Sequence, residues 1–125
     1  MANGVTWFEI ACSDFDRAKR FYETILGASL QDMPVPGQKM ASFPVDWEKG
    51  EIGGTIVQRE QSRPSSEGTL VYLHGGPDLQ VVLDRVVPAG GQVAMPKTQI
   101  PMENSGYMAV FIDSEGNLVG LTSMG

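Results

Sequence analysis

Several residue types that often carry chemistry are scarce in this chain of 125 residues. It has one cysteine, Cys12, and one histidine, His74. A single cysteine excludes an internal disulfide, and within an apolar segment it is expected to be a small buried thiol rather than a nucleophile. A single histidine leaves a catalytic metal site, which takes three protein ligands, dependent on carboxylates. The scarcity therefore excludes a disulfide scaffold and disfavours metal chemistry.

Positive charge and long apolar runs are also lacking. Lys and Arg number 9 against 15 Asp and Glu, which gives a net charge of -6, and the basic residues are scattered. Nucleic-acid binding needs a positive surface, so no nucleic acid is expected as a partner. No apolar run has the length of a membrane span, and residues 1–4 do not begin a signal peptide. We therefore expect a cytoplasmic protein with no membrane partner.

The clearest pattern that is present runs from Trp7 to Gly27, where a short strand leads directly into an amphipathic helix. Ser13 or Asp14 can cap the first turn of this helix, and Gly27 can end it in left-handed backbone. The apolar residues of the helix recur at i, i+3, i+4, i+7 and i+8, as one buried face requires: Ala18, Phe21, Tyr22, Ile25 and Leu26. In the strand, alternation turns one set of side chains toward the helix and the other away from it: Phe8, Ile10 and Cys12 toward, Trp7, Glu9 and Ala11 away.

The same order of elements occurs again in the second half of the chain. A strand-like run covers 69–74, and apolar residues with the same helical spacing follow over 78–87, closed by Pro88 and two glycines. This repetition of strand, helix and glycine stop indicates a tandem structural duplication.

The remaining strands complete both halves. We expect them at 28–33, 39–44 and 51–58 in the first half and at 92–96, 106–113 and 118–124 in the second. The polar segment 58–68 reads as the linker between a first module, 1–60, and a second module, 68–125, within one domain. Each half then has one helix and about four strands, which predicts an α+β fold with two curved four-stranded sheets. If the curved sheets enclose a cleft, the polar segment 95–106 either covers this cleft as a lid or crosses the end of the sheet.

Two motifs in this chain resemble the vicinal oxygen chelate superfamily, which includes glyoxalase I, bleomycin-resistance proteins and extradiol dioxygenases. They are SDFDRAKRFYETILG early in the chain and GYMAVFIDSEGNLVGL late in it. The resemblance covers nearly the whole chain and implies two tandem βαβββ modules that form a cupped, mostly antiparallel mixed sheet. It also implies a homodimer. It does not by itself imply one function, because one scaffold hosts several chemistries.

The positions at which the resemblance places metal ligands carry other residues here. The first-strand position is Trp7, the last-strand position is Gly120, and the position in the strand that opens the second half is Leu70 or Val71. None of these side chains holds a divalent ion, and His74 lies several residues beyond the expected position. We therefore predict no metal ligand and no cofactor, with a divalent metal as the alternative.

The cleft of the sheet is the expected site of function. Its candidate ligand-binding residues are Trp7, Glu9, Tyr72, His74, Tyr107, Gly120 and Thr122. Glu9 is also the candidate catalytic residue, because a carboxylate in an apolar-walled pocket can transfer protons. The alternative is a Glu9 carboxylate paired with a nearby Arg or Lys. Trp7 either forms a wall for a ligand or fills the cleft, and Gly120 leaves space opposite it.

The first functional hypothesis is binding of a small organic molecule in this cleft without a metal. The second is a glyoxalase-type lyase, isomerase or dioxygenase with metal ligands not identified in the sequence. The third is a structural dimer with a filled cleft.

Overall fold

The computed structural model describes residues 3–125 and places two four-stranded sheets beside each other. In the first sheet the strand order is β1-β4-β3-β2, with β1 at Phe8–Ala11, β2 at Gln31–Met33, β3 at Lys39–Ser42 and β4 at Gly54–Gln58. In the second it is β5-β8-β7-β6, with β5 at Tyr72–His74, β6 at Gln92–Gln99, β7 at Tyr107–Ile112 and β8 at Leu118–Ser123. One pair in each sheet is parallel, β1 with β4 and β5 with β8. The predicted α+β fold of two tandem βαβββ modules is confirmed.

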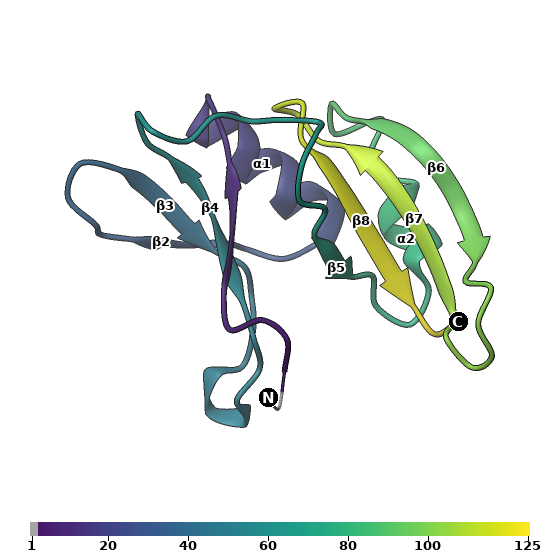
Figure 1. The fold of residues 1–125 in the computed structure, drawn as a ribbon. Coiled ribbons are helices and arrows are strands. Elements are labelled where there is room, and N and C mark those ends of the chain that lie inside the picture. The colour runs from purple at the N-terminus through teal and green to yellow at the C-terminus, as the bar shows by residue number, and fades with distance from the viewer. Residues whose placement is uncertain (1–2) are drawn as a thin grey trace.

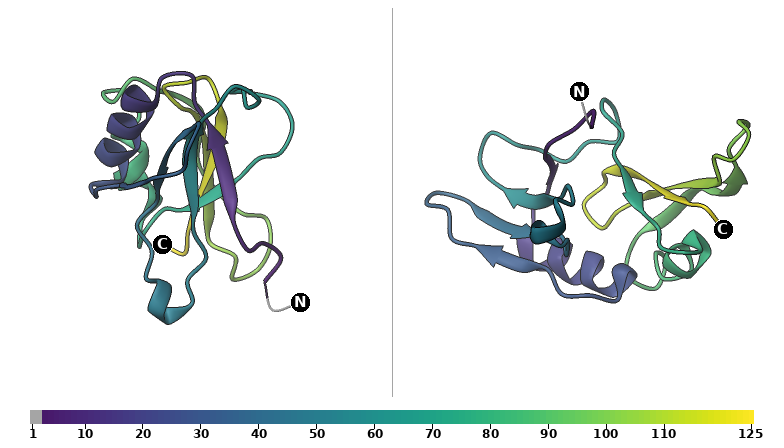
Figure 2. Two further views of the ribbon diagram at one scale, coloured as in Figure 1. Left: turned by 90° about the vertical axis from the view of Figure 1, so that its left-hand side faces the viewer. Right: turned by 90° about the horizontal axis from the view of Figure 1, so that it is seen from below.

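The two modules are arranged with their helices on one side. Figure 1 shows β1 and β5 toward the middle of the molecule and β2 and β6 at its outer edges. Both views of Figure 2 show α1 (Phe15–Leu26) and α2 (Leu79–Leu83) on the same side of the sheets, with the connector after β4 on the other side. No helix within residues 3–125 is long and apolar enough to cross a membrane.

Helix α1 has the ends and the buried face that its sequence predicts. The Asp14 side chain accepts a hydrogen bond from the Arg17 N–H, and Gly27 ends the helix at φ 62°. The helix buries Phe15, Ala18, Phe21, Tyr22 and Ile25. In β1, Ile10 is buried and Phe8 packs against the same core, so Trp7, Glu9 and Ala11 belong to the opposite face.

Helix α2 is shorter than the predicted 78–87. Its regular part ends at Leu83, and the chain continues in tight turns, with the N–H groups of Arg85 and Val86 bonded to carbonyls three residues back. Val86 is still fully buried. The apolar spacing therefore predicts the buried face correctly, although hydrogen bonding changes from the α-helical to the tighter pattern before Pro88.

Strand β6 is longer than the predicted 92–96. It continues to Gln99 through Pro96, with register shifts between Val93 and Met95 and between Met95 and Thr98. Proline is tolerated here because β6 is an edge strand and the irregular pairing leaves its nitrogen without a ladder partner. The irregular connection that follows is therefore 100–106 rather than the whole of 95–106.

One apolar core serves both modules. Phe21 and Tyr22 of α1 pack on Phe111 of β7, with ring centroids 6.0 and 6.4 Å apart. The Tyr22 hydroxyl donates to the Asp113 carboxylate, 2.7 Å away, in a fully buried setting. Burial, and then the Asp113 charge, raise the pKa of Tyr22 well above its usual value, so this phenol stays a donor.

Candidate functional site

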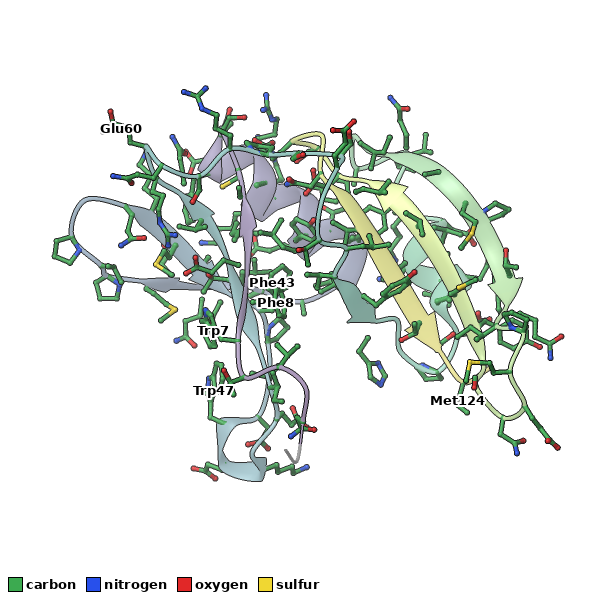
Figure 3. The ribbon with its side chains drawn as sticks, in the orientation of Figure 1. Trp7, Phe8, Phe43, Trp47, Glu60 and Met124 are labelled. Carbon is green, nitrogen blue, oxygen red and sulfur yellow. The ribbon has the colours of Figure 1, made fainter. Side chains whose placement is uncertain are left out.

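The first-sheet face that turns away from α1 carries two of the predicted site residues, Trp7 and Glu9. The Trp7 ring stacks on Trp47 at 5.6 Å between centroids, with an interplanar angle of 21°. The Glu9 carboxylate accepts two hydrogen bonds from the Arg59 guanidinium, at 2.8 and 3.0 Å. Figure 3 shows Trp7 and Trp47 on one side of the β1 and β4 ribbons and Phe8 and Phe43 on the other. Glu9 thus has the paired arrangement that the sequence left as its alternative.

The second sheet carries Tyr72, His74, Gly120 and Thr122 on one face. Tyr72 pairs with Gly120 and His74 with Thr122 across β5 and β8, so the four share a face, opposite the buried Leu73. A Cβ atom added at Gly120 would collide with the Tyr72 ring. The space above Gly120 is therefore filled by Tyr72, which remains 46% exposed.

Tyr107 does not share that face. It alternates in β7 with Ala109 and Phe111, both fully buried, and it packs against the common core. The ammonium group of Lys97 lies 4.6 Å from the centroid of its ring. We expected Tyr107 to line the cleft beside Tyr72. This expectation is wrong, because Tyr107 lies on the core-facing side of the second sheet. The residue of β7 that lies directly opposite Thr122 is Met108.

The residues at the expected metal-ligand positions do not fit a metal ion. Alternation with Tyr72 puts Leu70 on the cleft side and Val71 on the core side, where Val71 packs. Trp7, Leu70 and Gly120 carry no donor atom for a cation. The His74 Nδ1 accepts the Gly76 N–H at 3.0 Å. Within residues 3–125 no three His, Cys, Asp or Glu side chains gather so that they could hold an ion.

A hollow of about 830 Å³ lies at the junction of the two modules. Its walls include Phe8, Phe43 and Ile52 from the first module and Tyr72 and His74 from the second. Glu51 supplies a carboxylate at the same hollow. This volume lies in the range of small-molecule sites. The lining is also typical of such sites, because it is mostly apolar and carries a few polar groups. Two predicted residues, Tyr72 and His74, are thus brought together in it.

A second hollow, of about 930 Å³, has a different character. It lies beside the connector and is lined mainly by polar side chains, among them Lys39, Arg59, Arg63 and Glu115. Arg59 is engaged by Glu9 and Glu115 by Arg17, at 2.6 Å between Nε and Oε2. Because the charged side chains of Arg59 and Glu115 already have partners, this hollow is the weaker candidate for ligand binding.

Three residues of the first module were missed by sequence reasoning. Arg59 and Trp47 lie far in sequence from their partners, and no local pattern pairs them. Thr55 is fully buried, and its Oγ1 has no hydrogen-bond partner. Here a signal existed, because alternation through the predicted strand 51–58 puts Gly53, Thr55 and Val57 on the face of Trp7 and Glu9.

A comparison with protein-family models agrees with this fold. Residues 4–121 match the model of the glyoxalase/bleomycin resistance protein/dioxygenase superfamily. The chain belongs to this superfamily. The match includes both modules and the connector between them.

Curated relatives of this superfamily member are about twice as long as it is. The chain is 32% identical over 121 residues to "Putative glyoxylase CFP32" of Mycobacterium bovis and to the protein of the same name from Mycobacterium tuberculosis. The match covers 92% of this chain and 43% of each relative. The chain therefore spans less than half of the relatives' length.

Solved structures show the same fold at lower identity. A glyoxalase I mutant from Zea mays has a TM-score of 0.72 at 20% identity, over 94% of this chain and 46% of that one. A glyoxalase/bleomycin resistance protein/dioxygenase family enzyme from Burkholderia phytofirmans PsJN has a TM-score of 0.68 at 15% identity, over 96% and 98% of the chains. The structure of UcmS2 has a TM-score of 0.65 at 24% identity, over 98% of each.

Proposed function

We propose that this chain binds a small organic molecule in the hollow between its modules, without metal chemistry. The observation that carries the proposal is the hollow of about 830 Å³, walled by Phe8, Phe43 and Tyr72 from both modules. Burying an apolar ligand there gains the hydrophobic free energy of its surface, and the few polar groups fix its orientation. The donor-free residues at the family's ligand positions support binding without a metal.

Two side chains supply polarity in the proposed site. His74 is exposed at the end of β5, and Glu51 lies across the hollow on the segment before β4. A carboxylate at the rim, in a chain of net charge -6, favours a neutral or cationic ligand over an anionic one. Trp7 and Glu9 remain candidates for ligand contact on the other face of the first sheet.

The test is a ligand screen by thermal shift, followed by calorimetric titration of any compound that stabilises the protein. His74→Trp puts a large ring into the hollow and should abolish binding. Thr98→Trp is the matched control, because Thr98 is also an exposed strand residue of the second sheet but does not line the hollow. Hits that bind both variants like the wild type would exclude this site.

The second candidate function is a glyoxalase-type reaction. The observation that favours it is the similarity to relatives named as glyoxylases and to the fold of glyoxalase I. In the absence of fitting metal ligands, the residues available for proton transfer are Glu9, which is paired with Arg59, and His74 and Glu51 at the hollow. Turnover of methylglyoxal with glutathione that is abolished by Glu9→Gln would favour this candidate and the catalytic role of Glu9.

A further inference from the structure

Positive charge gathers at one end of the first sheet, although the chain as a whole is acidic. Lys39, Arg59 and Arg63 line the hollow of about 930 Å³ there, and they are three of the nine Lys and Arg residues in the chain. Figure 3 shows Glu60, which also lines this hollow, at the far end of β4 from the labelled Trp47. Among the described residues none lines both this hollow and the one between the modules, so the two are separate places on the molecule.

Arg59 is the fixed part of this wall. Its guanidinium donates to Glu9 of β1, its Nε donates to the side-chain oxygen of Gln38 at 2.9 Å, and its Nη1 lies 3.5 Å from the Ser62 hydroxyl. Arg59 therefore ties together β1, the turn before β3 and the connector, while its own charge is balanced by Glu9. Because the oxygen of the Gln38 amide accepts from Arg59, the NH₂ group of that amide is left as a donor.

Two other cations of this hollow keep their charge available. Within residues 3–125 neither Lys39 nor Arg63 forms an ion pair, and both are exposed. Lys39 begins β3 opposite Gln58, and Arg63 lies on the connector, so they reach the hollow from separate segments. Like charges on the wall of one hollow attract an anion more strongly than either does alone.

The beginning of α1, which borders the same hollow, has no free donors for a ligand. Its Phe15 N–H donates to Gln58, and the N–H groups of Ser13 and Asp14 donate to Glu115. An anion in this hollow therefore depends on side chains rather than on the end of the helix.

We propose that Lys39, Arg63 and the Gln38 amide bind a phosphate group in this hollow, either as free phosphate or as the monoester of a small organic molecule. A phosphate dianion has three terminal oxygens, one for each of these donors, whereas a carboxylate has two. Ammonium and guanidinium groups are also the side chains that bind phosphate most often. The volume of about 930 Å³ leaves room for an organic remainder. This site goes beyond the proposed function and does not rest on it.

The probes that test the site are glycerol 3-phosphate, inorganic phosphate and malonate, a dicarboxylate dianion. Binding is followed at low ionic strength through the backbone N–H signals of ¹⁵N-labelled protein. Glycerol 3-phosphate should shift the signals of 37–39 and 59–63 saturably, and malonate should bind more weakly. Tighter binding of glycerol 3-phosphate than of inorganic phosphate would support an organic phosphate, and equal binding would support the free ion. The absence of a saturable shift with either phosphate, or binding of malonate as tight as theirs, would exclude the proposal.

Two charge-removing variants test the assigned side chains. Lys39→Gln and Arg63→Gln should each weaken glycerol 3-phosphate at least about fivefold, the loss of one charge-assisted contact. Lys49→Gln and Arg20→Gln are the matched controls, because both residues are exposed and neither lines this hollow. They change the net charge equally and should weaken binding less than about twofold.

Two further variants complete the test. Glu60→Gln should strengthen glycerol 3-phosphate binding about twofold or more, because it removes a carboxylate that lines the hollow and repels the anion. A gain of affinity cannot result from misfolding. His74→Trp, which blocks the hollow between the modules, should leave this binding unchanged. The site is excluded if the matched controls weaken binding as much as Lys39→Gln and Arg63→Gln do, if Glu60→Gln weakens it, or if His74→Trp abolishes it. Only the last result would place the probe between the modules, so failure of this site is distinguishable from failure of the proposed function.

Discussion

The Glu115 carboxylate, on the turn between β7 and β8, is bonded to Arg17 in the first turn of α1, with Oε2 2.6 Å from the arginine Nε. Its Oε1 accepts the N–H groups of Ser13 and Asp14. The second module thus neutralises the positive end of a helix that belongs to the first. The side chain of Glu115 has no exposed surface, whereas that of Arg17 is 49% exposed.

This pair predicts a loss of stability in acid. Burial alone would raise the pKa of Glu115, but hydrogen bonds from Arg17, Asp14, Ser114 and Ser13 outweigh it and lower the pKa from 4.5 to about 2. Because the folded pKa is the lower one, the stabilisation is complete above about pH 5 and is lost as the pH falls toward 2. It amounts to about 3 kcal/mol. We expect Glu115→Gln to lower the free energy of unfolding at pH 7 and to converge with the wild type near pH 2.

Urea unfolding at several pH values measures this difference. Glu103→Gln, on the exposed 100–106 connection, is the matched control and should follow the wild-type curve. Curves for Glu115→Gln and wild type that stay parallel from pH 7 to pH 2 would contradict the assignment.

Two glycines that face aromatic rings should differ in their tolerance of alanine. A Cβ atom at Gly54 would collide with the Phe8 carbonyl oxygen and the Phe8 ring, inside the core. At Gly120 the three atoms nearest to the added Cβ all belong to the ring of Tyr72, which is 46% exposed and can rotate away. We expect Gly54→Ala to cost about 3 kcal/mol or more and Gly120→Ala about 1 kcal/mol. Thermal unfolding of both variants checks the order, and equal costs would show that Tyr72 is held as firmly as Phe8.

Cys12 should be inert while the protein is folded. The residue is 2% exposed, and burial, followed by the charges of Glu115 and Asp113, raises the pKa of its thiol to about 12. Since the thiolate is the reactive form, labelling by a disulfide reagent at pH 8 should wait for unfolding. The labelling rate should therefore rise with urea in parallel with the unfolded fraction. Immediate labelling of the native protein would mean that the strand end at Cys12 opens.

No stoichiometric metal should remain on the protein. Trp7, Leu70 and Gly120 provide no ligand atoms, so dialysis with Zn, Ni, Mn or Fe salts and then with buffer should leave well under one ion per chain. Elemental analysis of protein purified without a metal-affinity tag measures this. Retention of about one ion would make His74 and Glu51 the first ligands to replace.

Sequence reasoning predicted most of the fold because the information is local. The spacing from Ala18 to Leu26 and the residues Asp14 and Gly27 determine α1, and the repeated pattern after residue 69 predicts the second module. The features that sequence reasoning missed depend on contacts between residues that lie far apart in the sequence. The partner of Glu9 is fifty positions away in sequence, as the bond to Arg59 shows, and no periodicity indicates it.

The candidate site was predicted less well, for a related reason. In 107–112 both alternating sets are apolar or aromatic, so the strand does not indicate which set faces the helix. Tyr107 therefore received the wrong face, although the strand itself was predicted correctly. Thr55 shows the opposite case, because its face followed from alternation but its lack of a hydrogen-bond partner is visible only in three dimensions.

The shared aromatic core of Phe21, Tyr22 and Phe111 has a consequence for how the chain folds. Neither half can form a complete hydrophobic core alone, because each lacks the aromatic rings that the other contributes. Unfolding should therefore be a single cooperative event. The connector then acts mainly as a tether that keeps the local concentration of one half high around the other. Peptides covering 1–60 and 68–125 should be poorly structured alone and should reassemble when mixed, with an affinity that reports the strength of their common interior.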